Sequence, residues 1–190
     1  MDTKIIYREP IGNPDRKYRQ DRFIISTFRA LTKDLRRGLE LCKELGFDMV
    51  EFGWVSPAES YECVTACDEV GIDGIIQNWD VFGGFQTTEG IDEVDVEKVK
   101  EYIKYIQQYK HIVGYYVWDE PYEDDKIDAA AKQVKLFEKL DPDRMPFTVA
   151  IPSYNDKWTW ENGLFEEYLY KYTERIIIIV CRISIFINST

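Results

Sequence analysis

Two adjacent acidic residues, Asp119 and Glu120, end an apolar and aromatic run that begins at Val113. Aromatic and β-branched residues in such a run are typical of a buried strand. Pro121 cannot continue the hydrogen-bond ladder of this strand, because proline has no N–H. A carboxyl group where a buried strand opens into a loop is partly desolvated, which favours its protonated form and suits it to proton transfer near neutral pH. The alternative is that Asp119 or Glu120 only caps the following helix.

The composition favours a globular protein with an uncharged ligand. Of the 190 residues 45% are hydrophobic, which is enough for one sizeable core. The net charge of -11 repels phosphate backbones and anionic lipid, so we expect neither nucleic acid nor a membrane surface as a partner. Aromatic residues make up 15% of the chain. An acidic, aromatic-rich protein suits a neutral polyhydroxylated ligand, such as a carbohydrate, better than a phosphorylated one.

The cysteines and the chain start carry no metal or targeting signal. Cys63 and Cys67 lie four positions apart on a predicted helix, but no second Cys or His pair completes a metal site. We therefore predict reduced, structural thiols and no metal or other cofactor. The first residues lack the apolar core of a signal peptide, which predicts a cytoplasmic location. No run approaches the roughly 18 apolar residues of a membrane span.

Strand-like segments alternate with amphipathic helices. The predicted strands are 23–28, 49–55, 72–79, 113–118 and 147–151. We expect Thr32 to cap the first helix, with apolar positions that include Leu39, Leu41 and Leu45. The strongest helix start is Ser56-Pro57-Ala58-Glu59, which has a cap residue, a proline at the first helical position and a glutamate three residues after the cap. Further helices are predicted to end near 109, to cover 126–140 and to cover 163–173.

This repeat predicts a parallel sheet covered by helices. A doubly wound sheet should carry a glycine fingerprint after its first strand, but Phe28-Arg29-Ala30-Leu31 has none. We therefore predict a partial (β/α)8 barrel of five to six units over residues 21–175, after an extended lead-in at 1–20. In such barrels the active site gathers at the C-terminal ends of the strands.

Tryptophans recur at those strand ends. A single Trp at a strand end is usually core packing, but all five tryptophans lie at or just beyond one, including Trp158 and Trp160 after the fifth strand. Indole faces stack on the C–H faces of sugar rings, so the recurrence favours a carbohydrate site. The predicted substrate-binding residues are Trp54, Asn78, Trp79, Trp118 and Asp119.

The last residues change in character. From Arg175 to Ile187 the chain has no acidic residue, and a complete barrel takes about 250 residues. The Ile-rich tail at 176–190 is predicted to be either a sixth strand or the result of a reading-frame change or premature stop in a longer barrel. In both cases open strand edges would favour aggregation.

The end of the fourth predicted strand resembles the retaining (β/α)8 glycoside hydrolases, the clan that includes β-galactosidases, cellulases and mannanases. In that clan the strand ends in Asn-Glu-Pro, and its glutamate is the general acid/base. The resemblance implies that Glu120 is the acid/base here and that Asp119 stands where the clan has the asparagine that binds the sugar 2-hydroxyl. A carboxylate accepts a hydrogen bond from a hydroxyl but cannot donate one as an amide does.

The nucleophile of such an enzyme is not visible in this chain. Retaining hydrolysis needs a second carboxylate about 5–5.5 Å from the first, and in the clan it comes from strand seven. Glu51 is a candidate by type, but its mid-strand position favours a polar residue of the barrel interior. The chain is therefore expected to hold half an active site and to be inactive alone.

Two other functions fit the same pattern. A sugar isomerase or epimerase is one, because Leu45-Gly46-Phe47-Asp48-Met49-Val50-Glu51 is a fair match to its second strand. Those enzymes use carboxylate and histidine metal ligands, and the only histidine, His111, precedes the fourth strand at the opposite end. The other is a carbohydrate-binding remnant that keeps the aromatic residues without the chemistry.

Overall fold

A computed structural model describes residues 24–29, 34–82, 95–121, 123–150 and 168 of the chain. Five parallel strands form one sheet in sequential order, with β1 next to β2 and so on to β5. The strands are β1 (Ser26–Phe28), β2 (Met49–Phe52), β3 (Asp73–Ile76), β4 (Ile112–Asp119) and β5 (Met145–Val149). The helices are α1 (Leu35–Glu44), α2 (Pro57–Val70), α3 (Trp79–Phe82), α4 (Val96–Ile106) and α5 (Asp124–Leu140).

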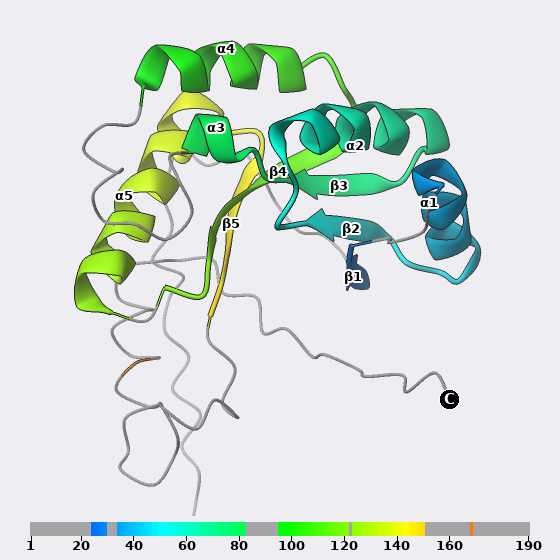
Figure 1. Cartoon of the computed structure of the whole chain (residues 1–190), viewed down its shortest axis with the longest axis horizontal. Helices are drawn as coiled ribbons and strands as arrows, with labels where there is room; N and C mark the ends of the chain where they lie inside the picture. The colour runs from blue at the N-terminus through cyan, green and yellow to red at the C-terminus, as the bar shows by residue number, and fades with distance from the viewer. Residues whose placement is uncertain (1–23, 30–33, 83–94, 122, 151–167, 169–190) are drawn as a thin grey trace, which may run out of the picture.

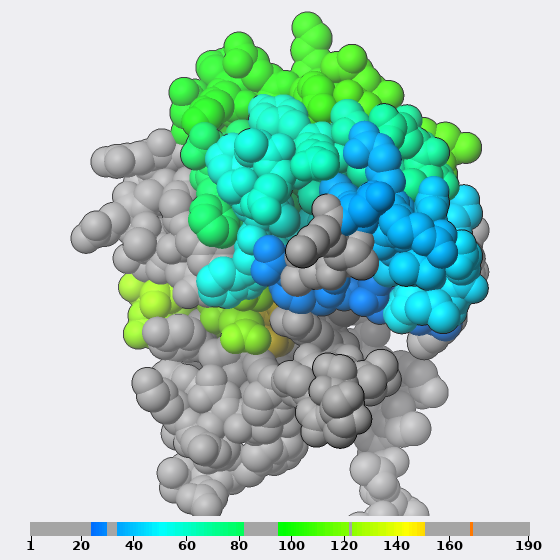
Figure 2. All heavy atoms as spheres, turned by 45° about the vertical axis from the view of Figure 1, so that its right-hand side comes forward, coloured from blue at the N-terminus to red at the C-terminus, as the bar shows by residue number. Residues whose placement is uncertain are grey.

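The sheet curls, and the helices lie along its outer side (Figure 1). Helices α1 and α2 lie side by side on that outer surface (Figure 2), where the Arg36 guanidinium pairs with Glu69. Sequential parallel strands with helices on one side form part of a (β/α)8 barrel, as the sequence predicts. None of the helices in the described ranges is long and apolar enough to cross a membrane.

Several predicted boundaries were wrong. The third strand ends at Ile76, and Trp79 begins the short helix α3 instead of ending the strand. The second strand ends at Phe52, and the fifth begins two residues early at Met145. The lead-in at 1–20, Thr32, Trp158, Trp160, the tail and nearly all of the helix predicted at 163–173 lie outside the described residues.

Helix α1 differs from its prediction at its start and on its surface. Asp34 is its N-cap and accepts a hydrogen bond from Arg37 N at 3.1 Å. Leu39 is fully buried, but Leu41 and Leu45 are 37% and 75% exposed. Among the described elements α1 packs mainly against α2, and Leu41 and Leu45 stay on its exposed surface.

The predicted start of helix α2 is confirmed. The Ser56 hydroxyl accepts from Glu59 N at 3.3 Å, and the Glu59 carboxylate accepts from Ser56 N at 2.8 Å. Pro57 is the first helical residue, and Gly71, with φ 71°, ends the helix in the left-handed conformation. This reciprocal cap satisfies two backbone N–H groups that a helix start leaves open.

The two cysteines of α2 are core residues. Cys63 and Cys67 lie in the core, and neither they nor Cys42 form a disulfide. Burial raises the pKa of the Cys63 thiol to about 12. A thiol that stays protonated is a poor nucleophile and a poor metal ligand.

The side chains of the sheet divide between two separate clusters, because successive side chains of a strand point to opposite faces. The helix-side cluster fills the space between the sheet and the helices and includes Val50, Ile76, Tyr115 and Phe137. The interior cluster lies on the other face of the sheet. Its buried members are Met49, Ile75, Tyr116, Met145, Phe147 and Val149.

A β-bulge in β4 interrupts this alternation. Tyr116 pairs with Phe147 of β5, but the next pair is Trp118 with Thr148, so Val117 is an extra residue. Strict alternation from Tyr116 would send Trp118 to the interior and Asp119 to the helices. The extra residue reverses this, so Trp118 joins the helix-side cluster and the Asp119 carboxylate reaches the interior residue Tyr116. Bulges commonly redirect side chains in this way.

We expect Ser56→Ala to lower the free energy of unfolding by about 1 kcal/mol, because it leaves the Glu59 N–H of α2 without its acceptor. Urea denaturation followed by circular dichroism measures this. Thr65→Ala in the middle of the same helix is the control, since alanine is the better helix former there. An equal loss in both variants would contradict a specific role for the cap.

Candidate active site

The backbone is strained where three of the strands end. Arg29 follows β1, Trp54 follows β2 by two residues, and Glu120 follows β4. Their φ angles are 54°, 61° and 46°, and they are the only non-glycine residues with positive φ in the described part of the chain. A left-handed conformation costs a non-glycine residue roughly 1–2 kcal/mol. Such residues cluster at functional sites, where the surrounding structure holds them in place.

Asp119 joins β4 to the end of β2. Its side chain is nearly buried, with 5% exposure. One carboxylate oxygen accepts from Trp54 Nε1 at 2.8 Å, and the other accepts from the Tyr116 hydroxyl at 2.6 Å. The predicted residues Trp54 and Asp119 are therefore in direct contact, although 65 positions separate them in the sequence.

Gln77 joins the end of β2 to helix α3, and the sequence analysis did not single it out. Its Oε1 atom accepts from Trp54 N at 2.6 Å and from Trp79 Nε1 at 2.9 Å. Two predicted tryptophans are thus connected through one buried amide. Alternation from the interior residue Ile75 places Gln77 on the interior face, which is the signal that could have found it.

Arg29 holds the same segment from the side of β1. Its Nη2 atom donates to the Trp54 carbonyl oxygen at 3.0 Å, and its backbone N–H donates to Glu51 O at 3.0 Å. The backbone N–H, the backbone carbonyl and the indole N–H of Trp54 are therefore each bonded to a residue near the end of a different strand.

Asn78 and Trp118 lie on the helix side of the sheet. The Asn78 side chain accepts from Asp80 N at 3.2 Å and hydrogen-bonds to Tyr102 of α4, whose pKa is raised mainly by burial. Trp118 is 4% exposed within the helix-side cluster, and its Nε1 atom has no partner among the described residues. The structure does not join either residue to Trp54 and Asp119. Their roles in sugar binding stay predictions.

Glu120 is partly exposed at the point where β4 ends. Its backbone N–H donates to Val149 O at 3.0 Å, which fixes its position against the end of β5. Glu51 instead lies in mid-strand with 4% exposure, and its carboxylate accepts a hydrogen bond from the Ser26 hydroxyl. This is the interior polar position that the sequence indicates for Glu51.

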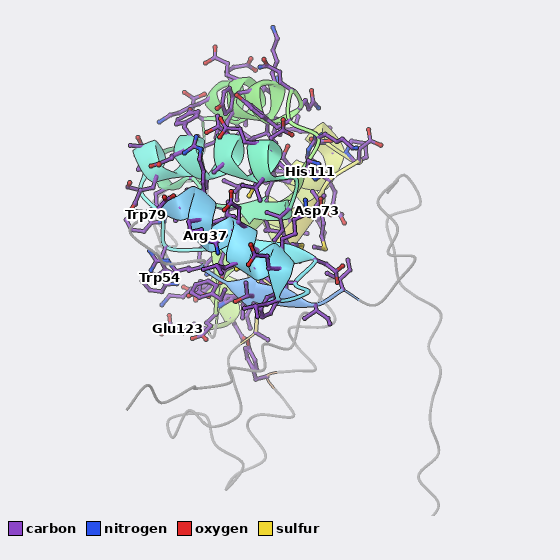
Figure 3. The ribbon with its side chains drawn as sticks, turned by 90° about the vertical axis from the view of Figure 1, so that its right-hand side faces the viewer. Arg37, Trp54, Asp73, Trp79, His111 and Glu123 are labelled. Atoms are coloured by element: carbon purple, nitrogen blue, oxygen red, sulfur yellow. The ribbon has the colours of Figure 1, made fainter. Side chains whose placement is uncertain are left out.

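The histidine lies at the other end of the strands. Figure 3 shows Trp54 and Trp79 on one side of the molecule, and His111 with Asp73 on the opposite side. The imidazole Nδ1 is 3.0 Å from a carboxylate oxygen of Asp73. In the ranges that the structure describes, no three His, Cys, Asp or Glu side chains gather as a metal site requires.

Comparisons with known proteins give a fold and no family. No family model and no curated protein matches the chain. A putative α-L-fucosidase from Bacteroides thetaiotaomicron superposes with a TM-score of 0.54 at 13% identity, over 80% of this chain and 62% of that one. The likeness is one of fold. β-Glucuronidases from an uncultured Clostridium sp. and from Dictyoglomus thermophilum superpose with TM-scores of 0.47 and 0.49, at 18% and 17% identity.

The chain is shorter than these proteins. Its aligned part covers 78% and 83% of its own length but only 32% and 35% of the two β-glucuronidases. It therefore spans less than two thirds of each of the three structures.

We expect Asp119→Asn to lower the free energy of unfolding by about 1–3 kcal/mol. The amide can accept from Trp54 Nε1 and donate to the Tyr116 hydroxyl, but it replaces two charge-assisted hydrogen bonds with weaker neutral ones and requires the Tyr116 hydroxyl to turn round. Urea denaturation measures the loss. Asp80→Asn, at an exposed carboxylate on α3, removes the same charge and should change stability by less than about 0.5 kcal/mol. A stable Asp119→Asn variant would show that the charge of Asp119 does not strengthen these hydrogen bonds.

Proposed function

We propose that this chain acts on a glycoside, which binds at the C-terminal ends of β2 to β4, with Glu120 as the general acid/base. The observation that carries the proposal is the network of Trp54, Gln77, Trp79 and Asp119 next to the strained residue Glu120. The site lies where (β/α) barrels place their chemistry. The superposed structure is that of a putative α-L-fucosidase, which agrees with a glycoside as substrate.

Trp54 has the properties of a stacking surface for a sugar. Its side chain is 43% exposed although its indole N–H is fixed on Asp119. An aromatic face stacks on the C–H groups of a sugar ring, and the neighbouring carboxylate can accept a hydrogen bond from a hydroxyl group. Neither group requires a charged ligand, which fits the acidic composition of the chain.

Glu120 would give its proton to the glycosidic oxygen as the bond breaks and then take a proton from the attacking water. Its left-handed backbone turns the chain out of β4 directly after Asp119, and its N–H is held by β5. This backbone position, directly after Asp119, supports the choice of Glu120 as the acid for the proposed sugar subsite. We assign the nucleophile to none of the described residues, since Glu51 is bonded to Ser26 in the interior.

Sugar binding without turnover is the second candidate. The exposed Trp54 favours it, because this indole could hold a sugar ring without any contribution from a catalytic pair of carboxylates. Binding of glycosides by NMR titration, with no hydrolysis at any pH, is its expected result. Metal-dependent turnover of a free sugar would instead support an isomerase.

The catalytic proposal is tested with Glu120→Gln and aryl glycosides in a full-length relative that also carries the second carboxylate, because this chain is expected to be inactive alone. The panel contains 4-nitrophenyl α-L-fucoside, β-D-glucoside and β-D-galactoside, together with the phenyl analogue of any glycoside that is hydrolysed. We expect hydrolysis of the phenyl glycoside to fall by a factor of about 10²–10⁴, because its poor leaving group needs protonation. Hydrolysis of the 4-nitrophenyl glycoside should fall much less.

Glu123→Gln is the matched control. Glu123 is an exposed carboxylate just beyond Glu120 that pairs with Lys126, so its removal should leave both rates unchanged. Equal losses on the two leaving groups in Glu120→Gln would remove Glu120 from proton transfer. A full-length relative that binds glycosides without hydrolysing them would reject the catalytic role and leave the binding site.

A further inference from the structure

We propose that Gln77 is a positioning residue that fixes the indoles of Trp54 and Trp79 for sugar stacking. The inference rests on the proposed function and adds to it a residue that would set affinity without touching the reacting atoms. Gln77 is 3% exposed just beyond the end of β3.

The two hydrogen-bond donors next to Gln77 determine which end of its amide group faces them. Trp54 N and Trp79 Nε1 can only donate, so the amide oxygen and not the amide nitrogen must face them. An aliphatic side chain at position 77 would leave two N–H groups without this acceptor. Gln77 is buried and both hydrogen bonds are partly buried, so their loss costs more than the loss of a fully exposed hydrogen bond.

Trp54 depends on this acceptor because its backbone is strained. With φ 61°, Trp54 persists in its conformation only while its neighbours hold it. Gln77 binds its N–H, Arg29 binds its carbonyl and Asp119 binds its indole. Core packing does not require this anchoring, since 43% of the Trp54 side chain is exposed.

A fixed aromatic surface binds more tightly than a mobile one. A side chain that is ordered only on binding loses rotational freedom at that moment, and this loss weakens the complex. Through its single oxygen Gln77 orders the Trp54 backbone and the Trp79 indole in the free protein. Its removal should therefore weaken glycoside binding even where the fold is kept.

The test compares Gln77→Met with Gln77→Glu. Methionine has a similar length but no strong acceptor, whereas glutamate keeps acceptor oxygens at the same place. In the sugar-free protein we expect Gln77→Met to speed hydrogen exchange of Trp79 Nε1–H and Trp54 N–H by about 5–10-fold. We expect it to raise the Kd for the 4-nitrophenyl glycoside that the wild type binds best by about 10-fold. Gln77→Glu should restore both values to near those of the wild type.

Tyr115→Phe is the control for general destabilisation. It removes a buried hydrogen bond of 2.7 Å to Asp141 on the helix side of the sheet, so it should lower stability and change neither the exchange at Trp79 nor the Kd. If Gln77→Met does not fold, Gln77→Asn replaces it with the same expectation. The asparagine side chain is one methylene shorter, so its amide oxygen lies farther from both donors.

The outcomes separate this inference from the proposed function. If the wild type binds no glycoside of the panel, the proposed function is wrong, and with it the sugar-binding role of Gln77. If the wild type binds but Gln77→Met changes neither exchange nor Kd, only the positioning role is wrong. A Tyr115→Phe variant that weakens binding as much as Gln77→Met would also overturn it, since the effect would then follow from stability alone.

Discussion

One extra residue in β4 determines which face of the sheet carries the Asp119 carboxylate. If Val117 were not an extra residue in the β4–β5 pairing, the Asp119 carboxylate would point at the helices and the Trp118 side chain at the interior. A buried carboxylate is tolerated only with hydrogen-bond donors around it. Here the bulge brings it to the Tyr116 hydroxyl and the Trp54 indole. The position of Trp54, and through Trp54 the contacts of Gln77 and Arg29, depends on this local change of register.

The two ends of the strands have different physical roles. At the N-terminal end of β4, the Arg144 guanidinium donates to Ile112 O at 2.8 Å and to the buried Asp141 carboxylate at 3.2 Å, and Asp141 also accepts from Tyr115. These groups tie the end of α5 to the sheet. At the C-terminal end of the strands, hydrogen bonds instead hold residues in the left-handed backbone conformation, which costs free energy. The chain therefore separates stability from its candidate chemistry along the strand direction, as (β/α) barrels do.

Local signals in the sequence predicted the repeat, the parallel sheet and the cap at Ser56, because each depends on a few neighbouring residues. The site was predicted only in part. Trp54 and Asp119 meet as the barrel geometry implies. The bulge at Val117 has no clear sequence signature, so the sequence could not show which face of the sheet Trp118 lies on. Gln77 was overlooked because glutamine is usually an exposed residue, and its burial follows from long-range packing.

Several departures from ordinary folding rules gather at one edge of the sheet. Three non-glycine residues with positive φ, a carboxylate and an amide buried at the strand ends, and a half-exposed tryptophan all lie where β1 to β4 end. Elsewhere in the described chain only the glycines Gly46 and Gly71 have positive φ. Apolar residues at these positions would avoid the cost of burying polar groups, so stability does not account for them. Natural proteins keep such local conflicts mainly where function requires them. That concentration, more than any single residue, is the physical argument for a binding site at this edge.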